Sequence, residues 1–384
     1  MIYFIILLFL FFHLSARGNT MITTLYAIQL QANPVQLGFI IASAALFPMI
    51  LAIYAGKVSD RLGYRIPLVF GSLGVGLALL LPYLFTDKLF ILYLSQLLFG
   101  LAYIFVLVPL QNLVGSLSSL ETRSRNFSTN SLSISLASLL GPAITGFSID
   151  HLNYATTYLG LSIMAAVPGI LIVWHGFPFP GTAIKEEDSK ERLMDLITSP
   201  ALRKMYMMSG VLLTGIGMYE FYFPIFAEHI GFSASTIGIL LSINASAYFI
   251  VRLFLPWLIR KFHEEAILTG CLFLSAVPFF LIPWFHDFIS LALISFILGL
   301  ALGCGQPLSI VLAYNYSPKG RTGEVLGIRL TVNKVVQLLV PILFGSIGSL
   351  LGFFPIFWSN AVLFLISGLK GLEKGGKNQK DIVS

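Results

Sequence analysis

The side chains best suited to carry charge or protons lie inside long apolar stretches of this chain. His13, Arg17, Thr20 and Thr24 recur at intervals of four, three and four residues. That spacing places them on one face of a helix. Ionisable groups within membrane helices are costly, usually face the protein interior, and are functional candidates by default. We expect Arg17 to hold an anionic group. His13 is either a proton carrier or a hydrogen-bonded packing residue.

Glu220 is the acidic candidate. Shifting the chain by 200 residues aligns Glu220 with Thr20. Thr20 lies on the same helix face as Arg17. If the two halves are related by a pseudo-twofold axis, Arg17 and Glu220 face each other across a central cavity. Two interpretations stay open: Glu220 carries a coupling proton while Arg17 holds the substrate, or the two form a structural ion pair.

Further polar candidates share faces of other apolar helices. They are Arg329, Asn333 and Gln337 at spacings of four, Lys334 beside them, Asn244 on one face with Tyr248 and Arg252, and Gln96. Arg252 and Arg329 lie near span ends, where long side chains can reach the membrane surface. Among the deep charges, Arg17 and Lys334 outnumber Glu220. The balance favours anionic or zwitterionic solutes.

The composition identifies the helices that must position these groups as membrane helices. Of 384 residues, 57% are apolar and only 10% are charged, against roughly 25% charged in soluble proteins. Mean hydropathy is +0.89. A soluble enzyme is excluded, and an all-α polytopic membrane protein is predicted. The two cysteines have no CxxC or His neighbour, so they predict neither a disulfide framework nor a metal site.

Twelve apolar segments are long enough to cross a bilayer. They cover residues 2–28, 35–56, 66–85, 89–114, 127–149, 153–175, 202–227, 234–257, 265–284, 287–314, 323–350 and 353–369. Dividing the chain at its charged middle predicts a six-helix bundle at 1–175, a cytoplasmic linker at 176–200, a second bundle at 201–374 and a tail at 375–384.

The basic residues predict the orientation. Eighteen of the 23 Lys and Arg residues lie in loops on the side of the two termini, and only Lys88 lies in a loop on the other side. Basic loops stay in the cytoplasm, so both termini are predicted to be cytoplasmic. The pI of 9.2 then reflects these loops and not nucleic-acid binding.

An internal repeat relates the two halves. The segment beginning at Leu25 aligns with that beginning at Ile225 at an offset of 200, and Pro142 and Gly146 align with Pro341 and Gly345 at 199. Two six-helix halves of the same orientation predict parallel repeats, the arrangement of secondary transporters with a midplane site.

The segment after the second span resembles the G-x-x-x-D-R-x-G-x-R-x-x-L signature of the major facilitator superfamily. The matching residues are Gly56, Asp60, Arg61, Gly63 and Arg65. The resemblance implies twelve helices in two bundles and a conformational latch, with Asp60 and Arg61 making charge contacts and Gly63 allowing a tight turn. The matching loop of the second half, 256–263, lacks the acid and the glycine, which predicts a one-sided latch.

A second resemblance lies in the fifth span. Gly141, Pro142 and Gly146 are similar to the G-P-x-x-G-G element of proton-driven drug exporters of that family, with Thr145 in place of a glycine. The alternative interpretation is a generic kink and packing notch, since proline breaks a helix hydrogen bond and glycine permits close approach. Gln96 departs from the pattern, because many exporters carry arginine there.

These observations predict a secondary transporter of the cell membrane that uses a proton or other ion gradient and acts as a monomer. Proton-coupled export of a small amphiphilic or anionic compound is favoured. The alternative is uptake of a small organic anion or sugar-like solute. A membrane-embedded enzyme is a remote alternative, because the sequence has no P-loop, HExxH or DxD motif. No cofactor, metal or nucleic-acid partner is expected.

Overall fold

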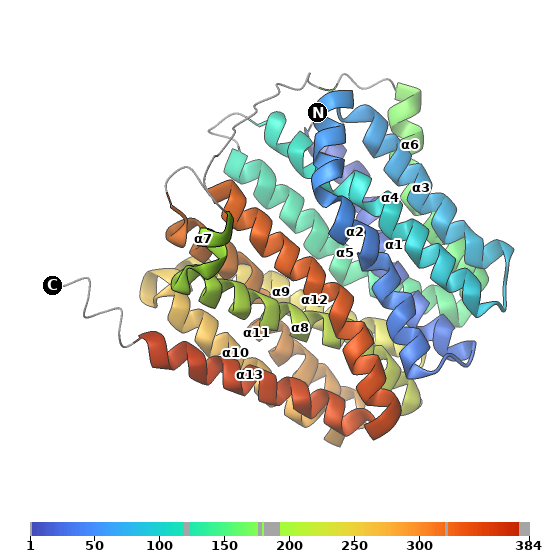
Figure 1. The fold of residues 1–384 in the computed structure, drawn as a ribbon. Coiled ribbons are helices and arrows are strands. Elements are labelled where there is room, and N and C mark those ends of the chain that lie inside the picture. The colour runs from blue at the N-terminus through green and yellow to red at the C-terminus, as the bar shows by residue number, and fades with distance from the viewer. Residues whose placement is uncertain (1, 119–122, 176–178, 180–192, 319–321, 376–384) are drawn as a thin grey trace. The chain divides into compact units, whose positions relative to one another are not determined.

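The computed structural model describes residues 2–118, 123–175, 179, 193–318 and 322–375 as helices joined by short turns (Figure 1). The elements are α1 (Ile2–Gln29), α2 (Pro34–Leu62), α3 (Arg65–Leu84), α4 (Leu89–Ser116), α5 (Arg123–His151), α6 (Tyr154–His175), α7 (Leu193–Thr198), α8 (Pro200–His229), α9 (Ala234–Lys261), α10 (Glu264–Leu281), η1 (Ile282–Trp284), α11 (Phe288–Tyr316), α12 (Thr322–Leu351) and α13 (Phe353–Gly375).

Twelve of the described helices are long and apolar enough to cross a membrane, every one except α7 and η1. Helices suit a bilayer because they satisfy their backbone hydrogen bonds internally. The all-α fold and the twelve predicted spans are thereby confirmed. The segment Lys185–Arg192 of the predicted linker lies outside the described residues.

The first turn of each sequence half shows the predicted repeat at the level of the backbone. Gln31 joins α1 to α2 with φ 59°, and Gly231 joins α8 to α9 with φ 92°. The amide of Ala32 donates to Ala27 O at 2.9 Å, and that of Phe232 donates to Ala227 O at 3.0 Å. All these positions differ by 200, so both halves leave their first helix through the same turn.

The second helix extends further than its apolar segment. Residues 57–62 were predicted to lie in a loop, but they form the last turns of α2. The helix ends only at Gly63, whose φ of 75° is a conformation that glycine adopts without strain. Hydropathy marks where the apolar surface ends, whereas the glycine marks where the helix ends.

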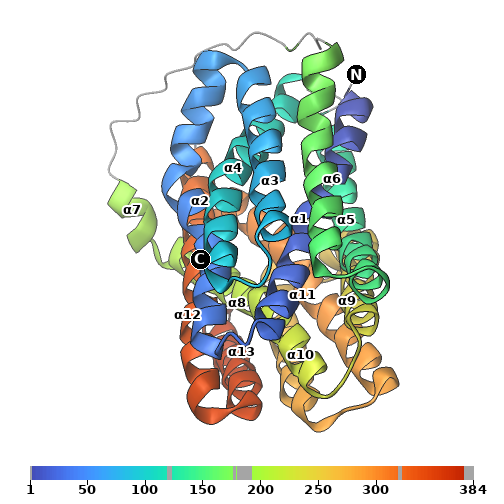
Figure 2. The same ribbon diagram turned by 90° about the vertical axis from the view of Figure 1, so that its right-hand side faces the viewer.

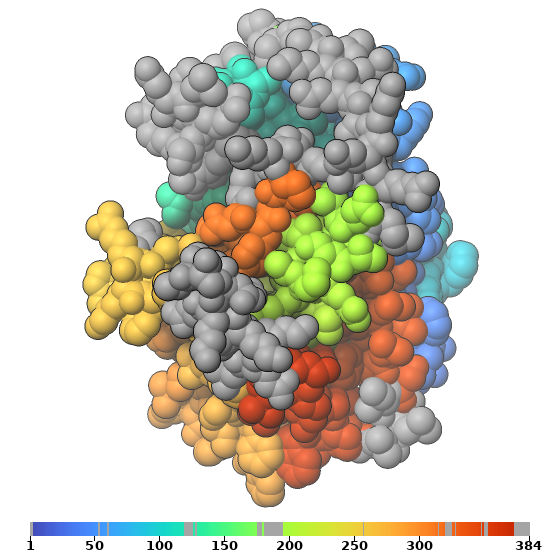
Figure 3. Space-filling model, turned by 60° about the vertical axis from the view of Figure 1, so that its left-hand side comes forward, coloured from blue at the N-terminus to red at the C-terminus, as the bar shows by residue number. Residues whose placement is uncertain are grey.

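The chain divides into two compact units. Unit 1 comprises residues 1–188 and 224–242, and unit 2 comprises 189–223 and 243–384. Within unit 1, α3 packs on α4 and α6, α2 packs on α4, and α1 packs on α5 and α6 (Figure 2). Within unit 2, α10 packs on α11 and α13, and the short α7 contacts α12. Figure 3 shows α7 and the start of α8, in lime, beside orange and red atoms of the later helices.

Close helix crossings recur at equivalent positions of the two units. A Cβ atom added to Gly100 of α4 would lie 2.3 Å from Ala44 O of α2. A Cβ added to Gly299 of α11 would lie 2.3 Å from Asn244 O of α9. Only glycine permits such an approach. Each unit therefore fixes its second and fourth spans by the same contact.

Candidate functional site

A closed polar network holds three helices of unit 1 together. The amides of Asn19 (α1) and Gln96 (α4) donate to each other's oxygens, both at 3.0 Å, and Gln96 Nε2 also donates to Thr23 Oγ1 at 2.9 Å. Thr23 Oγ1 lies 3.0 Å from the hydroxyl of Tyr158 on α6. All four side chains are buried. Gln96, predicted for the substrate pathway, thus belongs to an internal network whose polar groups satisfy one another.

Replacing Gln96 with leucine is expected to lower the thermal unfolding midpoint of the purified protein by several degrees. The change removes the acceptor of the Asn19 amide nitrogen, whereas Thr23 keeps its contacts with Asn19 and Tyr158. A buried orphaned polar group costs about 1–3 kcal/mol. Gln337→Leu is the matched control, since Gln337 is exposed. Equal midpoints for the two variants would show that the network contributes little to stability.

Unit 2 carries the corresponding contact between its own first and fourth spans. Tyr219 on α8 donates its hydroxyl hydrogen to Ser295 Oγ on α11 at 2.7 Å. These residues follow Asn19 and Gln96 by 200 and 199 positions. Asn244, another predicted pathway residue, is buried and donates to Ser295 O at 2.8 Å. Its amide therefore fixes α9 to α11 inside unit 2.

Arg17 lies at the crossing of α1 and α5. Its side chain is partly exposed, and a Cβ added to Gly141 would lie 2.9 Å from Arg17 Cβ and 3.0 Å from Leu14 O. One turn away, His13 is 4% exposed and packs its ring edge-on against Phe12 at 5.9 Å. Its Nε2 has no hydrogen-bond partner among the described residues. The α1 face predicted from spacing is therefore half-buried at Arg17 and buried at His13.

The predicted kink element makes two different close contacts. Pro142 lies inside α5, between glycines that face different helices. Gly141 approaches α1, whereas a Cβ on Gly146 would lie 2.3 Å from Ala234 O, at the start of α9. The contact with α9 is reciprocal, because a Cβ on Gly238 would lie 2.4 Å from Pro142 O. The element is a packing notch on both sides of α5.

Glu220 occupies a deep position in α8. Among the candidate spans of the described chain, it is the only acidic residue more than two residues from a span end. Its side chain is partly exposed, while its neighbours Tyr219 and Phe221 are buried at 1% and 2% exposure. A carboxylate at this depth is costly unless it is protonated or has a polar environment. Glu220 is thus a deep acidic residue whose side chain is only partly buried by the protein.

Arg329 is anchored inside unit 2; the sequence left open whether its side chain reaches the membrane surface. It is 3% exposed. Its Nε and one terminal nitrogen donate to Ser309 Oγ at 3.0 and 2.7 Å, and the same terminal nitrogen donates to Gln306 Oε1 at 2.5 Å. Gln306 and Ser309 lie on either side of Pro307, which is inside α11. Arg329 therefore fixes α12 to this part of α11.

The remaining candidates of α12 point to different partners. Asn333 is buried and accepts a hydrogen bond from Ser209 of α8 at 3.2 Å. Lys334 is partly exposed and donates to Gln337 at 2.9 Å, on an exposed part of the helix. The spacing of the α12 residues was therefore not enough to identify one site, since they reach α11, α8 and their own helix.

The residues of the latch signature lie at the end of α2 and the start of α3. A Cβ added to Gly56 would lie 3.7 Å from the side chain of Val108 on α4. The side chain of Arg61 is exposed. Arg65 donates to Val173 O of α6 at 3.4 Å. The side chain of Asp60 lies outside the described set. Its expected charge contact stays a prediction.

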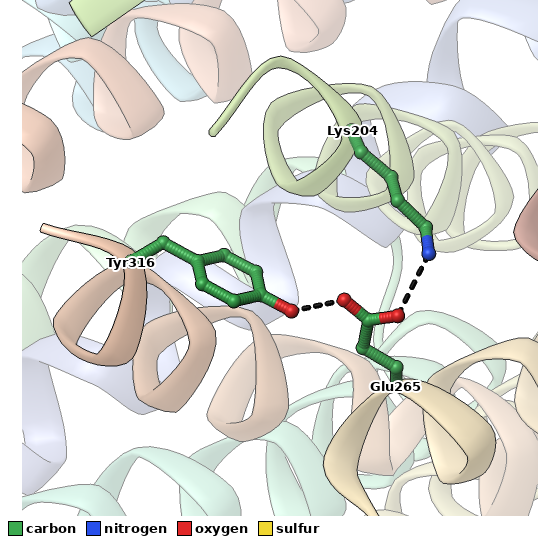
Figure 4. A network of polar contacts seen from close by, with 3 residues as sticks. All are labelled: Lys204, Glu265 and Tyr316. Atoms are coloured by element: carbon green, nitrogen blue, oxygen red, sulfur yellow. Dashed lines mark hydrogen bonds and ion pairs between the residues drawn. The ribbon is translucent and has the colours of Figure 1, made fainter. Parts of the chain in front are cut away.

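Unit 2 has a charged cluster that the sequence did not predict (Figure 4). Glu265, in the first turn of α10, accepts a hydrogen bond from Lys204 of α8 at 2.8 Å and another from Tyr316 at the end of α11. Burial and the bond to Glu265 raise the pKa of Tyr316. The only available signal was the pair of acids opening α10, which favours a helix N-terminus. The described residues include no group of three potential metal ligands.

Comparisons with known proteins agree with this architecture. The sequence model of the Major Facilitator Superfamily matches residues 4–288 and 205–373. Multidrug resistance protein 2 of Bacillus subtilis (strain 168) is 24% identical over 352 residues, covering 89% of this chain and 87% of the relative. Quinolone resistance protein NorA of Staphylococcus aureus (strain COL) is 22% identical over 318 residues, covering 81% and 80%.

Solved structures share the fold at lower identity. A POT family transporter in complex with a thioalcohol-conjugated peptide has a TM-score of 0.81 at 13% identity, covering 98% of this chain and 96% of the other. A mutant form of the nucleoside transporter NupG has a TM-score of 0.79 at 14% identity, covering 96% and 98%. At this identity the likeness concerns the fold.

Proposed function

Because the chain belongs to the major facilitator superfamily, and is thus a multi-pass membrane transporter and not an enzyme, we propose that it exports a small amphiphilic or anionic compound in exchange for protons. Arg17 holds an anionic group of the substrate, and Glu220 carries the coupling proton. The basic loops keep both termini in the cytoplasm. Two helix bundles expose the site to one side of the membrane at a time.

Glu220 is the observation that carries the proposal. A carboxylate in the middle of a membrane helix is expensive, and such residues mark proton relays in pumps and transporters. Its side chain is partly exposed and not fully buried in the protein. The relatives named as multidrug and quinolone resistance proteins support export over most of the chain length.

Uptake of a small organic anion or sugar-like solute is the second candidate. It is favoured by the excess of deep positive charge, since Arg17 and Lys334 both lie inside candidate spans with partly exposed side chains. Gln96 also differs from the arginine of many exporters. Substrate identity depends on the site and not on the fold, so a transport measurement decides between the two candidates.

The deciding experiment uses proteoliposomes that contain a trapped pH-sensitive dye. A panel of organic anions, cationic drugs and sugars is added, and the change in internal pH is recorded. Substrate-triggered proton movement opposite to substrate movement supports the proposed exchange, and movement in the same direction supports coupled uptake. Substrate movement without any pH change contradicts proton coupling.

Replacing Arg17 with alanine is expected to weaken binding of anionic substrates at least tenfold and to leave neutral substrates within about twofold. A hydrogen bond to a charged group contributes roughly 1.5–3 kcal/mol. Arg17→Lys keeps the charge and should retain part of the affinity. The measurement is the dissociation constant of each substrate for the purified protein. An equal loss for neutral substrates would instead indicate a structural role.

A further inference from the structure

One contact in unit 1 links the end of α5 to the start of α9 through a carboxylate. Asp150, the penultimate residue of α5, accepts a hydrogen bond from the backbone amide of Ser235 at 2.8 Å and another from that of Ala234 at 3.2 Å. These amides belong to the first turn of α9, where backbone N–H groups have no partner within the helix. Asp150 therefore supplies the cap of a helix that begins 84 residues later in the chain.

A carboxylate suits this position for two reasons. Its oxygens satisfy two of the unpaired amides, and its negative charge lies at the positive end of the α9 dipole. Charge-assisted hydrogen bonds of this kind are stronger than those between neutral groups. Asparagine in place of Asp150 keeps the shape and one acceptor, but it loses the charge and the second acceptor oxygen.

The cap lies beside the closest approach between the same two helices. Gly146 sits one turn before Asp150 on α5 and touches the backbone of Ala234, while Gly238 sits one turn into α9 and touches that of Pro142. The two helices are thus joined by two neighbouring contacts, the close approach at Gly146 and Gly238 and the hydrogen bonds of Asp150. The close approach requires the helices to lie together, and the negative charge of Asp150 favours that arrangement electrostatically.

Most helix caps are local, and the chain offers one for comparison. Asp287 precedes α11 and accepts a hydrogen bond from the amide of Ser290 at 2.8 Å, three residues later. That bond lowers the pKa of Asp287. Asp287 stabilises only the helix that it begins. Asp150 instead joins two helices that come from opposite halves of the repeat.

We propose that Asp150 is a positioning residue that holds the start of α9 against α5 and so keeps the substrate pathway closed at this end. The inference rests on the proposed function, in which the two sequence halves separate at each side in turn. On the orientation predicted from the basic loops, this end faces away from the cytoplasm. Opening toward that side requires the Asp150 hydrogen bonds to break.

The test measures the distance between the turn that follows α5 and the turn that precedes α9. Spin labels are placed at Leu152 and Ile230 of the full-length protein, in a background where Cys271 and Cys304 are replaced by alanine. The distances between the labels are recorded by double electron–electron resonance spectroscopy. Asp150→Asn is expected to raise the ratio of separated to joined conformations about fivefold, which corresponds to about 1 kcal/mol and matches the usual loss on removing a cap. Asp287→Asn is the matched control and should leave the ratio unchanged.

A second variant approaches the contact from α9. Ala234→Pro removes the longer hydrogen bond at a first-turn position that tolerates proline, and the equivalent residue of α2 is Pro34. A smaller shift in the same direction is expected. Unchanged distances in both variants, with unfolding midpoints equal to that of the background, would overturn the proposal. Because the distances require no transported substrate, a failure of proton exchange in proteoliposomes would contradict the proposed function without deciding the role of Asp150.

Discussion

Glutamine at position 220 is expected to abolish substrate-driven proton movement, with a residual rate at least 100-fold below that of the native protein. Glutamine has nearly the same shape as glutamate but cannot release or bind a proton near neutral pH. Because Glu220 is the only acid deep in the described spans, no neighbouring acid at that depth can take over the step. The measurement is the dye signal in proteoliposomes after substrate is added.

Counterflow separates the proton step from the rest of the cycle. Exchange of labelled for unlabelled substrate needs no net proton movement, so the Glu220→Gln variant should retain it within a few-fold. Glu228→Gln provides the matched control, because it changes an exposed glutamate two turns later on the same helix. Gradient-driven transport that persists in Glu220→Gln would remove this residue from coupling. Loss of both activities, with normal folding, would favour the structural ion pair.

The helices could be predicted because membrane helices are identified by length and hydropathy. Both follow from the bilayer thickness and from the cost of burying polar groups. The same reasoning missed α7, whose six residues lie inside the predicted linker and are too short for a periodic signal. It also ended the second helix at residue 56, because the charged turn that reaches Leu62 carries no hydropathy signal.

The candidate site was only partly predictable, because periodicity identifies a helix face but not its partner. Arg17 and Glu220 were selected from depth and repeat position, and their roles stay predictions. For Arg329, the distance from the span end left open whether the side chain reaches the membrane surface, and its actual partners are side chains on α11. Gln96 was predicted to line the substrate pathway, whereas in the structure it hydrogen-bonds Asn19 and Thr23 in a network that depends on how three helices pack.

Long-range charge contacts were the least predictable feature. Lys204, Glu265 and Tyr316 lie in three separate helices, and Glu265 is 61 residues from Lys204 and 51 from Tyr316. Ion pairs at such separations leave no spacing pattern, since the sequence does not show which of the many lysines lies near a given acid. Asp150 is similar: the sequence shows an acid at a helix end, but the helix that it caps is found only from the fold.

Alanine at position 146 is expected to reduce transport at least tenfold. Its Cβ would lie 2.3 Å from Ala234 O and 2.8 Å from Ala234 C, and backbone atoms cannot move aside as a flexible side chain can. Overpacking of this kind costs about 1–3 kcal/mol. If the notch forms in only one state of the cycle, that cost disfavours the joined arrangement of α5 and α9 by roughly 5- to 150-fold.

Two further substitutions make the prediction specific. Gly238→Ala should have the same effect, because its Cβ would meet Pro142 O at 2.4 Å from the other side of the notch. Gly160→Ala on α6 should be harmless, since no heavy atom lies within 4 Å of the added Cβ and alanine favours a helix. The measurement is transport per folded molecule, with folding checked by size-exclusion chromatography. Equal transport by the Gly146 and Gly160 variants would show that α5 and α9 need not approach this closely. The resemblance of this element to that of drug exporters would then have no mechanical basis in the chain.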